Sequence, residues 1–259
     1  MRIIALVSNE NTYQPLVYDE LLRGIGSEVV GLVIVPMMPS FRSKIKFLRF
    51  LFDLYSVQGF LIKLTHVARN KVLALLDPFF PLKHSCSLKR VAKKHGVPLL
   101  YTDDVNSEEF LEQVRQLKPD LIISSQGQII RKGLLQASRF GIINKHAGML
   151  PKYRGIYPVF WAMMNDEKQI GITIHFMNEA IDGGDIILQE ALDISKKDTF
   201  ESVYQKVIHK TPGLFLKAIN IIREGDYQLM KNDSKFASYY SYPTRNDIVR
   251  FKKLGKRIM

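Results

Sequence analysis

Short apolar runs alternate with segments of helical spacing through the first half of the chain, and this alternation limits the fold more than any other feature. It is typical of a parallel sheet whose strands are joined by crossover helices. We therefore expect an α/β fold with a doubly wound, mostly parallel, Rossmann-like sheet. The predicted strands are residues 2–7, 29–35, 98–101, 120–124, 141–144, 171–177 and 186–190, and the predicted helices are 15–24, 87–95, 108–117, 133–137 and 160–165.

The second half predicts one long helix and an irregular tail. Asp198 and Glu201 have the spacing of a capping box for a helix that continues through Pro212 to about residue 223. We divide the chain into a core of residues 1–225, with a helical insertion at about 37–85, and a C-terminal extension of residues 226–259 that ends in a short basic helix.

Charge and cysteine content restrict the class of protein. The 259 residues carry a formal net charge of +12, which favours anionic partners such as nucleotides, nucleic acids or lipid head groups. The single cysteine, Cys86, leaves no internal disulfide and no CxxC metal site, so we expect no bound metal. The start of the chain lacks the basic and long apolar regions of a signal peptide, and these features together predict a cytoplasmic protein.

The insertion is basic and amphipathic. A helical pair packed on the sheet, an element lying on the inner face of the membrane, and a homodimer interface all agree with its pattern. Residues 41–77 contain two acidic side chains, Asp53 and Asp77, and seven basic ones, namely Arg42, Lys44, Lys46, Arg49, Lys63, Arg69 and Lys71.

The stretch "NKHAGMLPKYRG" begins at the end of a predicted strand. Asn144 and His146 alternate with Lys145, so their side chains leave one face at the edge where parallel sheets bind ligands. An imidazole there can exchange a proton near neutral pH, and an amide can donate to an oxygen that becomes negative. Asp182, in the glycine-flanked turn "AIDGGDII", is the candidate carboxylate for orienting the histidine, although each of these features alone is more often structural.

Taken together, these stretches resemble the folate-dependent formyltransferase family. "IINKHAGMLPKYRGIYPVFWAM" and "GITIHFMNEAIDGGDIILQE" are similar to the family's N-x-H-x-x-x-LP-x-x-RG element and its later D-x-G-x-I-I turn. "KPDLIISSQGQIIRKGLLQ" is similar to the strand and loop before that element, and the resemblance covers residues 1 to about 225 apart from the insertion. It implies catalytic roles for Asn144, His146 and Asp182. One departure is Gly148, where the family usually has serine.

The resemblance also implies substrates. The formyl donor is expected to be 10-formyltetrahydrofolate, and an amine is expected to be the acceptor. The pterin of the donor is expected between two loops, chiefly against backbone groups of Gly127, Gln128, Ile129, Ile130, Ala180, Ile181 and Gly183. Arg154 and Gly155 are expected to shape the acceptor side.

Within the family, the chain looks most like sugar N-formyltransferases, which formylate nucleotide-linked aminosugars in surface polysaccharide biosynthesis. The C-terminal segment is shorter than the RNA-binding domain that methionyl-tRNA formyltransferases add to this core, so a nucleic acid partner is not expected. Expected contacts are base stacking on Tyr239, Tyr240 and Tyr242, and phosphate binding by Arg245 together with Asn9, Asn11 and Thr12. A methionyl-tRNA or other small-amine acceptor, a lipid-linked sugar, a formyltetrahydrofolate hydrolase and a non-catalytic binding module remain alternatives.

Overall fold

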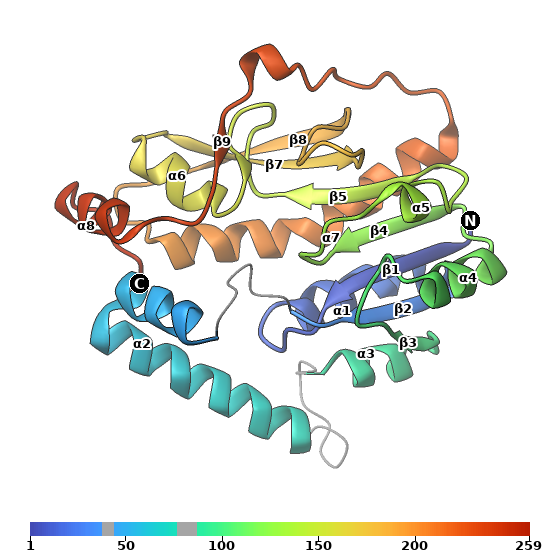
Figure 1. Cartoon of the computed structure of the whole chain (residues 1–259), viewed down its shortest axis with the longest axis horizontal. Coiled ribbons are helices and arrows are strands. Elements are labelled where there is room, and N and C mark those ends of the chain that lie inside the picture. The colour runs from blue at the N-terminus through green and yellow to red at the C-terminus, as the bar shows by residue number, and fades with distance from the viewer. Residues whose placement is uncertain (38–43, 77–86) are drawn as a thin grey trace.

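A computed structural model describes residues 1–37, 44–76 and 87–259 and contains a seven-stranded sheet (Figure 1). The strand order is β3-β2-β1-β4-β5-β7-β8, in which β3 to β5 run parallel and the pairs β5–β7 and β7–β8 are antiparallel. The predicted doubly wound, mostly parallel fold is therefore confirmed. The strands are β1 (Ile3–Ser8), β2 (Val29–Val35), β3 (Leu99–Tyr101), β4 (Leu121–Ser125), β5 (Ile142–His146), β7 (Gln169–Phe176) and β8 (Ile186–Asp193).

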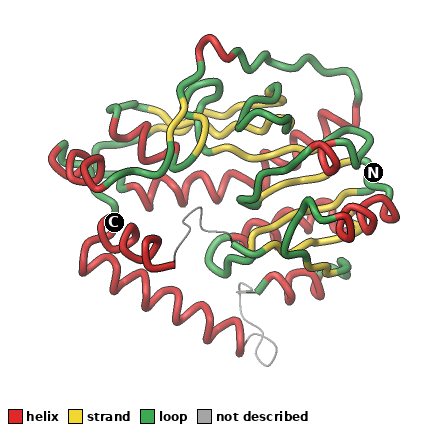
Figure 2. The backbone as a smooth tube through the Cα atoms, in the orientation of Figure 1, coloured by secondary structure: helices red, strands yellow, loops and turns green. Residues whose placement is uncertain are grey.

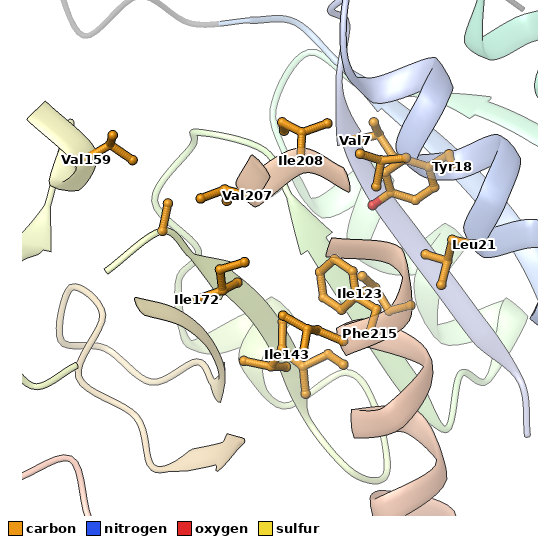
Figure 3. Close-up of a cluster of buried hydrophobic side chains, with 14 of the residues drawn as sticks. Val7, Tyr18, Leu21, Ile123, Ile143, Val159, Ile172, Val207, Ile208 and Phe215 are labelled. Atoms are coloured by element: carbon orange, nitrogen blue, oxygen red, sulfur yellow. The ribbon is translucent and has the colours of Figure 1, made fainter. Parts of the chain in front are cut away.

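Helices cover both faces of this sheet (Figures 1 and 2). Because strand side chains alternate, Ile143 joins a core under α1 (Gln14–Ile25) and α7 (Phe200–Glu224), as Figure 3 shows, whereas Ile142 joins a second core under α4 (Glu108–Leu117) and α5 (Lys132–Leu135). The other helices of this region are η1 (Gly26–Glu28), α3 (Leu88–Lys94) and α6 (Pro158–Met164). The alternation therefore fixes which side chains of β5 reach which face.

The predicted start of the long helix is wrong by one residue. Thr199, and not Asp198, is the N-cap of α7, and its capping partner is Ser202. Asp198 instead accepts hydrogen bonds from the Ser195 N–H and the Ser202 hydroxyl. This shift directs Glu201 away from the helix end and into a buried contact with the insertion.

The insertion is a helical hairpin in its described part. α2 (Lys44–Leu76) is broken at Ser56, where φ is 61° and ψ is 176°, into two helical segments (Figure 1). Leu54 is fully buried, and the ring of Phe50 packs edge-on against Tyr157 and Tyr242. Residues 38–43 and 77–86, which contain Arg42, Asp77 and Cys86, lie outside the described residues.

The buried carboxylate of Glu201 ties the hairpin to the core. It accepts hydrogen bonds from the hydroxyls of Tyr13 and Tyr55 and from the Lys63 ammonium, which lies 2.8 Å away. Tyr55 and Lys63 belong to α2, Tyr13 precedes α1, and Glu201 lies in the first turn of α7. Three elements that are far apart in sequence therefore meet at one charge.

The C-terminal extension returns to the "NKHAGMLPKYRG" stretch. It contains η2 (Ser234–Phe236), β9 (Tyr239–Tyr240) and the basic helix α8 (Arg245–Lys253), which packs against α2. β9 pairs with β6 (Arg154–Gly155) and so holds the extension against the RG of this stretch. Within the described residues, no helix has both the length and the apolar character needed to cross a bilayer.

Candidate active site

The candidate site lies at the end of β5. Asn144 and His146 leave the same face of this strand, and the antiparallel register with β7 sets His175 beside Asn144 and Thr173 beside His146. His146 and His175 are almost completely buried, at 5% and 1% exposure. Lys145 leaves the opposite face, where its ammonium lies 5.9 Å from the centre of the Tyr204 ring.

The turn between β7 and β8 brings Asp182 to this face. The turn folds back tightly at Gly184, where a Cβ atom would lie 1.9 Å from the Phe176 carbonyl oxygen, so only glycine fits. Asp182 itself has a left-handed backbone with φ of 48°, and its carboxylate accepts the Gly155 N–H at 2.8 Å. This hydrogen bond therefore joins the β7–β8 turn to the RG of β6 at Asp182, the candidate catalytic carboxylate.

The structure brings the three predicted catalytic side chains into one cluster. The Oδ2 atom of Asp182 lies 3.4 Å from His146 Nδ1, and its Oδ1 atom lies 3.7 Å from His175 Nε2. The Nδ2 atom of Asn144 lies 3.5 Å from the same His175 nitrogen. His175 thus connects Asn144 to Asp182, and the sequence reasoning missed it although it is a histidine within a predicted apolar strand.

Backbone carbonyls fix the proton positions on both rings. His146 Nε2–H donates to the Tyr153 carbonyl and His175 Nδ1–H donates to the Phe176 carbonyl, each at 2.7 Å. In the neutral rings, the lone pairs then lie on His146 Nδ1 and His175 Nε2. His175 can accept the Asn144 amide, and a proton arriving at His146 Nδ1 would face the Asp182 carboxylate.

Burial keeps both rings neutral in the resting protein. It lowers the pKa of His146 below its ordinary value, and the Asp182 carboxylate opposes that shift. Burial also lowers the pKa of His175, to about 4, again against the influence of Asp182. A neutral His146 beside a carboxylate is suited to accept a proton during a reaction.

Gly148 makes room for the ring of His146. A Cβ atom at this position would lie 2.7 Å from His146 Nε2, which is closer than van der Waals contact allows. The glycine that departs from the usual serine therefore permits the ring orientation in which Nε2 reaches the Tyr153 carbonyl.

The two loops predicted to hold the donor differ in how they are fixed. The Gln128 side chain donates to the Asp103 carbonyl at 2.8 Å and accepts the Val105 N–H at 3.0 Å, which ties its loop to the segment before α4. In the other loop, the Gly183 N–H donates to the Ala180 carbonyl. Each loop exposes a large apolar side chain, since Ile129 is 70% and Ile181 is 49% exposed, whereas Ile130 is buried.

On the predicted acceptor side, Arg154 is engaged within the protein. Its Nη2 atom donates to the carbonyl and the side-chain oxygen of Asn232, at 3.1 and 2.7 Å. The Asn232 amide in turn donates to the carbonyls of Asp182 and Gly184. Asn232, which the sequence reasoning also missed, therefore holds the β7–β8 turn from the C-terminal extension.

The three tyrosines predicted to stack on a base have different surroundings. The ring of Tyr240 stacks on Trp161, with centroids 4.8 Å apart, and the ring of Tyr242 packs against Tyr157. Tyr239 is 57% exposed beside Gly155. Tyr240 and Tyr242 fasten the extension to the core, and Tyr239 is the member of this set with a ring open to solvent.

The remaining predicted substrate contacts belong to the loop after β1 and to α8. Asn9 is exposed at the end of β1, and Asn11 and the half-buried Thr12 follow Glu10 in this loop. The Glu10 carboxylate accepts the N–H groups of Thr12, Tyr13 and Gln14, at 2.5 to 3.1 Å, and so occupies the donors that a pyrophosphate would use. Arg245 is exposed and lines a hollow between α2 and α8.

An α/β sheet with a histidine, a carboxylate and an amide at its edge defines a class of enzymes that move a proton while stabilising a negative oxygen. Among the described residues, no group of three or more His, Cys, Asp or Glu has the arrangement of a metal site. The sequence model of the formyl transferase family matches residues 77–219. This range is more than half of the chain, and it includes Asn144, His146 and Asp182. The chain belongs to the formyl transferase family.

Known proteins resemble different parts of the chain. The methionyl-tRNA formyltransferase of Bacillus cytotoxicus is 32% identical over 173 residues, which cover 66% of this chain and 55% of that protein. The chain spans about half the length of the curated relatives it matches first.

Solved structures with the same fold cover more of the chain. The N-formyltransferase of Helicobacter canadensis, solved with folinic acid and dTDP-3-aminofucose, has a TM-score of 0.60 and 20% identity, covering 93% of this chain and 71% of that one. The glycinamide ribonucleotide transformylase of Symbiobacterium toebii has a TM-score of 0.61 and 19% identity, covering 90% and 94%.

Proposed function

We propose that this protein transfers a formyl group from 10-formyltetrahydrofolate to the primary amine of an aminosugar, and that it does so in the cytoplasm. The acceptor that we favour is a nucleotide-linked aminosugar. The observation that carries the proposal is the cluster of Asn144, His146 and Asp182 at the end of β5, in a chain of the formyl transferase family. The proposed catalytic roles of these residues follow from their positions and proton states.

His146 acts as the base. As the amine nitrogen bonds to the formyl carbon, the nitrogen loses a proton to Nδ1 of His146, and the Asp182 carboxylate at 3.4 Å stabilises the imidazolium that forms. The Asn144 amide donates to the formyl oxygen while that oxygen is negative. His175 positions Asn144 by accepting its second N–H, and the proton on His146 is then available for the departing nitrogen of the donor.

The two loops proposed for the donor carry apolar side chains that suit its pterin ring. Exposed isoleucines, Ile129 and Ile181, stand on the two loops that we propose for the pterin, and apolar side chains of this kind are suited to a flat heterocycle. The donor supplies the formyl group, and backbone groups of residues 127–130 and 180–183 would orient it.

The choice of acceptor is supported by the fold and by one side chain. Sugar N-formyltransferases are among the solved structures with this fold, and one of them was solved with a dTDP-linked aminosugar. Tyr239 stands exposed next to Gly155, whose N–H binds Asp182, so a base stacked on Tyr239 would lie near the reacting amine.

Methionyl-tRNA is the second candidate acceptor. Curated relatives at 32% and 35% identity include methionyl-tRNA formyltransferases, and the net charge of +12 would attract a nucleic acid. A non-catalytic module is disfavoured because it has no need for a buried histidine, a second histidine and a carboxylate in contact.

A panel of acceptors tests the proposal. The full chain and 10-formyltetrahydrofolate are incubated with nucleotide-linked aminosugars, glycinamide ribonucleotide and charged initiator tRNA, and mass spectrometry detects an added formyl group. We expect a formylated sugar, lost in His146→Ala and retained in His209→Ala, which removes an exposed histidine of α7. A formylated tRNA alone would replace the acceptor, and no formylated amine at all would reject the function.

A further inference from the structure

The outer side of α2 carries an unusual amount of exposed apolar surface. Large apolar side chains that are 37% to 78% exposed are Ile45, Leu48, Phe52, Val57, Leu61, Ile62, Leu64, Val67, Val72 and Leu75. Single exposed apolar residues are common on proteins, whereas a contiguous set marks a surface that binds something. In Figure 1 the second segment of α2 forms the lower edge of the molecule.

In this second segment most of the exposed apolar residues form one stripe, and Ile62 and Val67 lie on either side of it. Steps of three or four residues place them on the same side of an α-helix, because 3.6 residues make one turn. We call this set the outer stripe, and its members are Val57, Leu61, Leu64, Ala68, Val72 and Leu75.

The opposite side of the hairpin is fixed to the protein. Leu54 and Tyr55 are buried, Lys63 and Tyr55 bind Glu201, and the buried Asn70 donates to the Thr12 hydroxyl at 3.4 Å. These contacts leave the hairpin no freedom to turn its stripe inward without breaking a buried ion pair. The outer stripe is therefore exposed by the packing of the hairpin.

The charge of this surface is strongly positive. Besides Lys63, which is paired with Glu201, residues 45–75 contain one acidic side chain, Asp53, and the basic side chains Lys46, Arg49, Arg69 and Lys71. The stripe begins at Val57, which also lines a hollow of about 280 Å³ between α2 and α8. Arg245 and Lys252 of the basic helix α8 line the same hollow, so α8 adds two cations beside the start of the stripe.

The charge decides between occupants of the stripe. A stripe with steps of three and four residues also suits a helix of a second copy, but pairing two such hairpins would bring two positive surfaces together. Nucleic acid would satisfy the cations and leave the apolar stripe in water. An anionic bilayer accepts both, because its head groups bind the cations and its acyl boundary takes the apolar side chains.

We propose that the outer stripe of α2, with the basic residues beside it and on α8, docks this protein on the surface of an anionic lipid bilayer. The apolar side chains enter the head-group region while Arg69 and Lys71 bind lipid phosphates. The acceptor would then be formylated close to a membrane. The docking does not depend on formyl transfer, so each can fail without the other.

Vesicle sedimentation with the full chain tests the docking. We expect binding to vesicles of phosphatidylcholine mixed with phosphatidylglycerol, little binding to phosphatidylcholine alone, and release at high salt. Leu61→Glu should weaken binding about tenfold or more, because it removes apolar contact and adds a negative charge. Lys71→Ala should weaken it about fivefold.

Phe236→Glu is the matched control, because this side chain is 68% exposed, lies in η2 and undergoes the same apolar-to-acidic change. It should bind vesicles as the wild type does, and circular dichroism melts should show that both variants are folded. Equal vesicle binding by wild type and Leu61→Glu, or no binding to anionic vesicles, would overturn the proposal. A wild-type dimer in light scattering that becomes a monomer in Leu61→Glu would also overturn it, in favour of a second copy.

Discussion

Replacing Asp182 with asparagine isolates the charge in the candidate site. Asparagine has the same shape, tolerates the left-handed backbone at φ 48°, and can still accept the Gly155 N–H through its side-chain oxygen. What it removes is the negative charge 3.4 Å from His146 Nδ1. The substitution therefore acts on the proton that His146 takes up and leaves the fold in place.

The size of the effect follows from that distance. A unit charge at 3.4 Å from an imidazolium is worth about 5 kcal/mol at an effective dielectric constant of about 20. Because the proton is on His146 only as the amine reacts, this energy stabilises the transition state and not the resting enzyme. If most of it is lost, kcat/KM should fall by about three orders of magnitude.

Steady-state formylation of the acceptor found in the panel measures this loss. Asp185→Asn, an identical change three residues later at an exposed position, is the control and should keep kcat/KM within about threefold. If Asp182→Asn also retains kcat/KM within about threefold while the protein stays folded, the carboxylate does not stabilise a charged His146, and the proton-transfer role is wrong.

Three further predictions concern stability, each measured by urea unfolding. Glu201→Gln should lower the unfolding free energy by about 2 kcal/mol at pH 7, because it leaves Lys63 without its buried partner. Burial raises the pKa of Glu201, but the hydrogen bond and charge of Lys63 and its other partners bring it below the ordinary 4.5. The difference from wild type should therefore persist above pH 4.5 and shrink as pH falls through the lowered pKa, and an unchanged difference at low pH would contradict the assignment. Lys145→Met should raise the unfolding free energy at pH 7 by about 1 to 3 kcal/mol, because burial lowers the pKa of this lysine to about 8. That gain should diminish as pH rises from about 8 towards 10.5, since the wild-type lysine is then neutral in the fold, and a loss of stability at pH 7 would show that its charge is well solvated. Gly155→Ala should lower the unfolding free energy by about 2 kcal/mol or more, because φ is +96° and the added Cβ would lie 2.2 Å from a carbonyl oxygen of β9, whereas Gly213→Ala, with open space in α7, should not.

The sheet was predictable because buried parallel strands are continuous apolar runs. The predicted strand 29–35 has the same bounds as β2, and the observed β5 extends two residues past its predicted end, to His146. Alternation along this strand was also enough to put Asn144 and His146 on one face. Local pattern therefore supplied the fold and half of the candidate site.

The missing parts depend on contacts between distant residues. Asn232 holds the turn of Asp182 from a position 50 residues later, and β6 and β9 are strands of two residues that leave no periodic pattern. Glu201 has the spacing of a capping residue, but Lys63 of the insertion, 138 residues earlier, binds its carboxylate. Propensity and spacing are local quantities, and they cannot report which partner a side chain meets after the chain has folded.

The loop after β1 shows the same limit. Asn9, Asn11 and Thr12 have the polar character of a phosphate loop, and a helix N-terminus follows them. Glu10, within the same loop, folds back and takes the N–H groups at the start of α1. A nucleotide that binds this protein has therefore to displace a carboxylate or bind elsewhere, and Tyr239 is the contact that we favour.

A single-turnover experiment tests the central claim most directly. Excess enzyme is mixed with 10-formyltetrahydrofolate and the amine, and tetrahydrofolate and the formylated amine are both quantified over time. The account predicts that the two products appear together in equal amounts, and that His146→Ala forms neither. Tetrahydrofolate that accumulates without formylated amine would mean that water is the acceptor, and this result would contradict transfer to an amine.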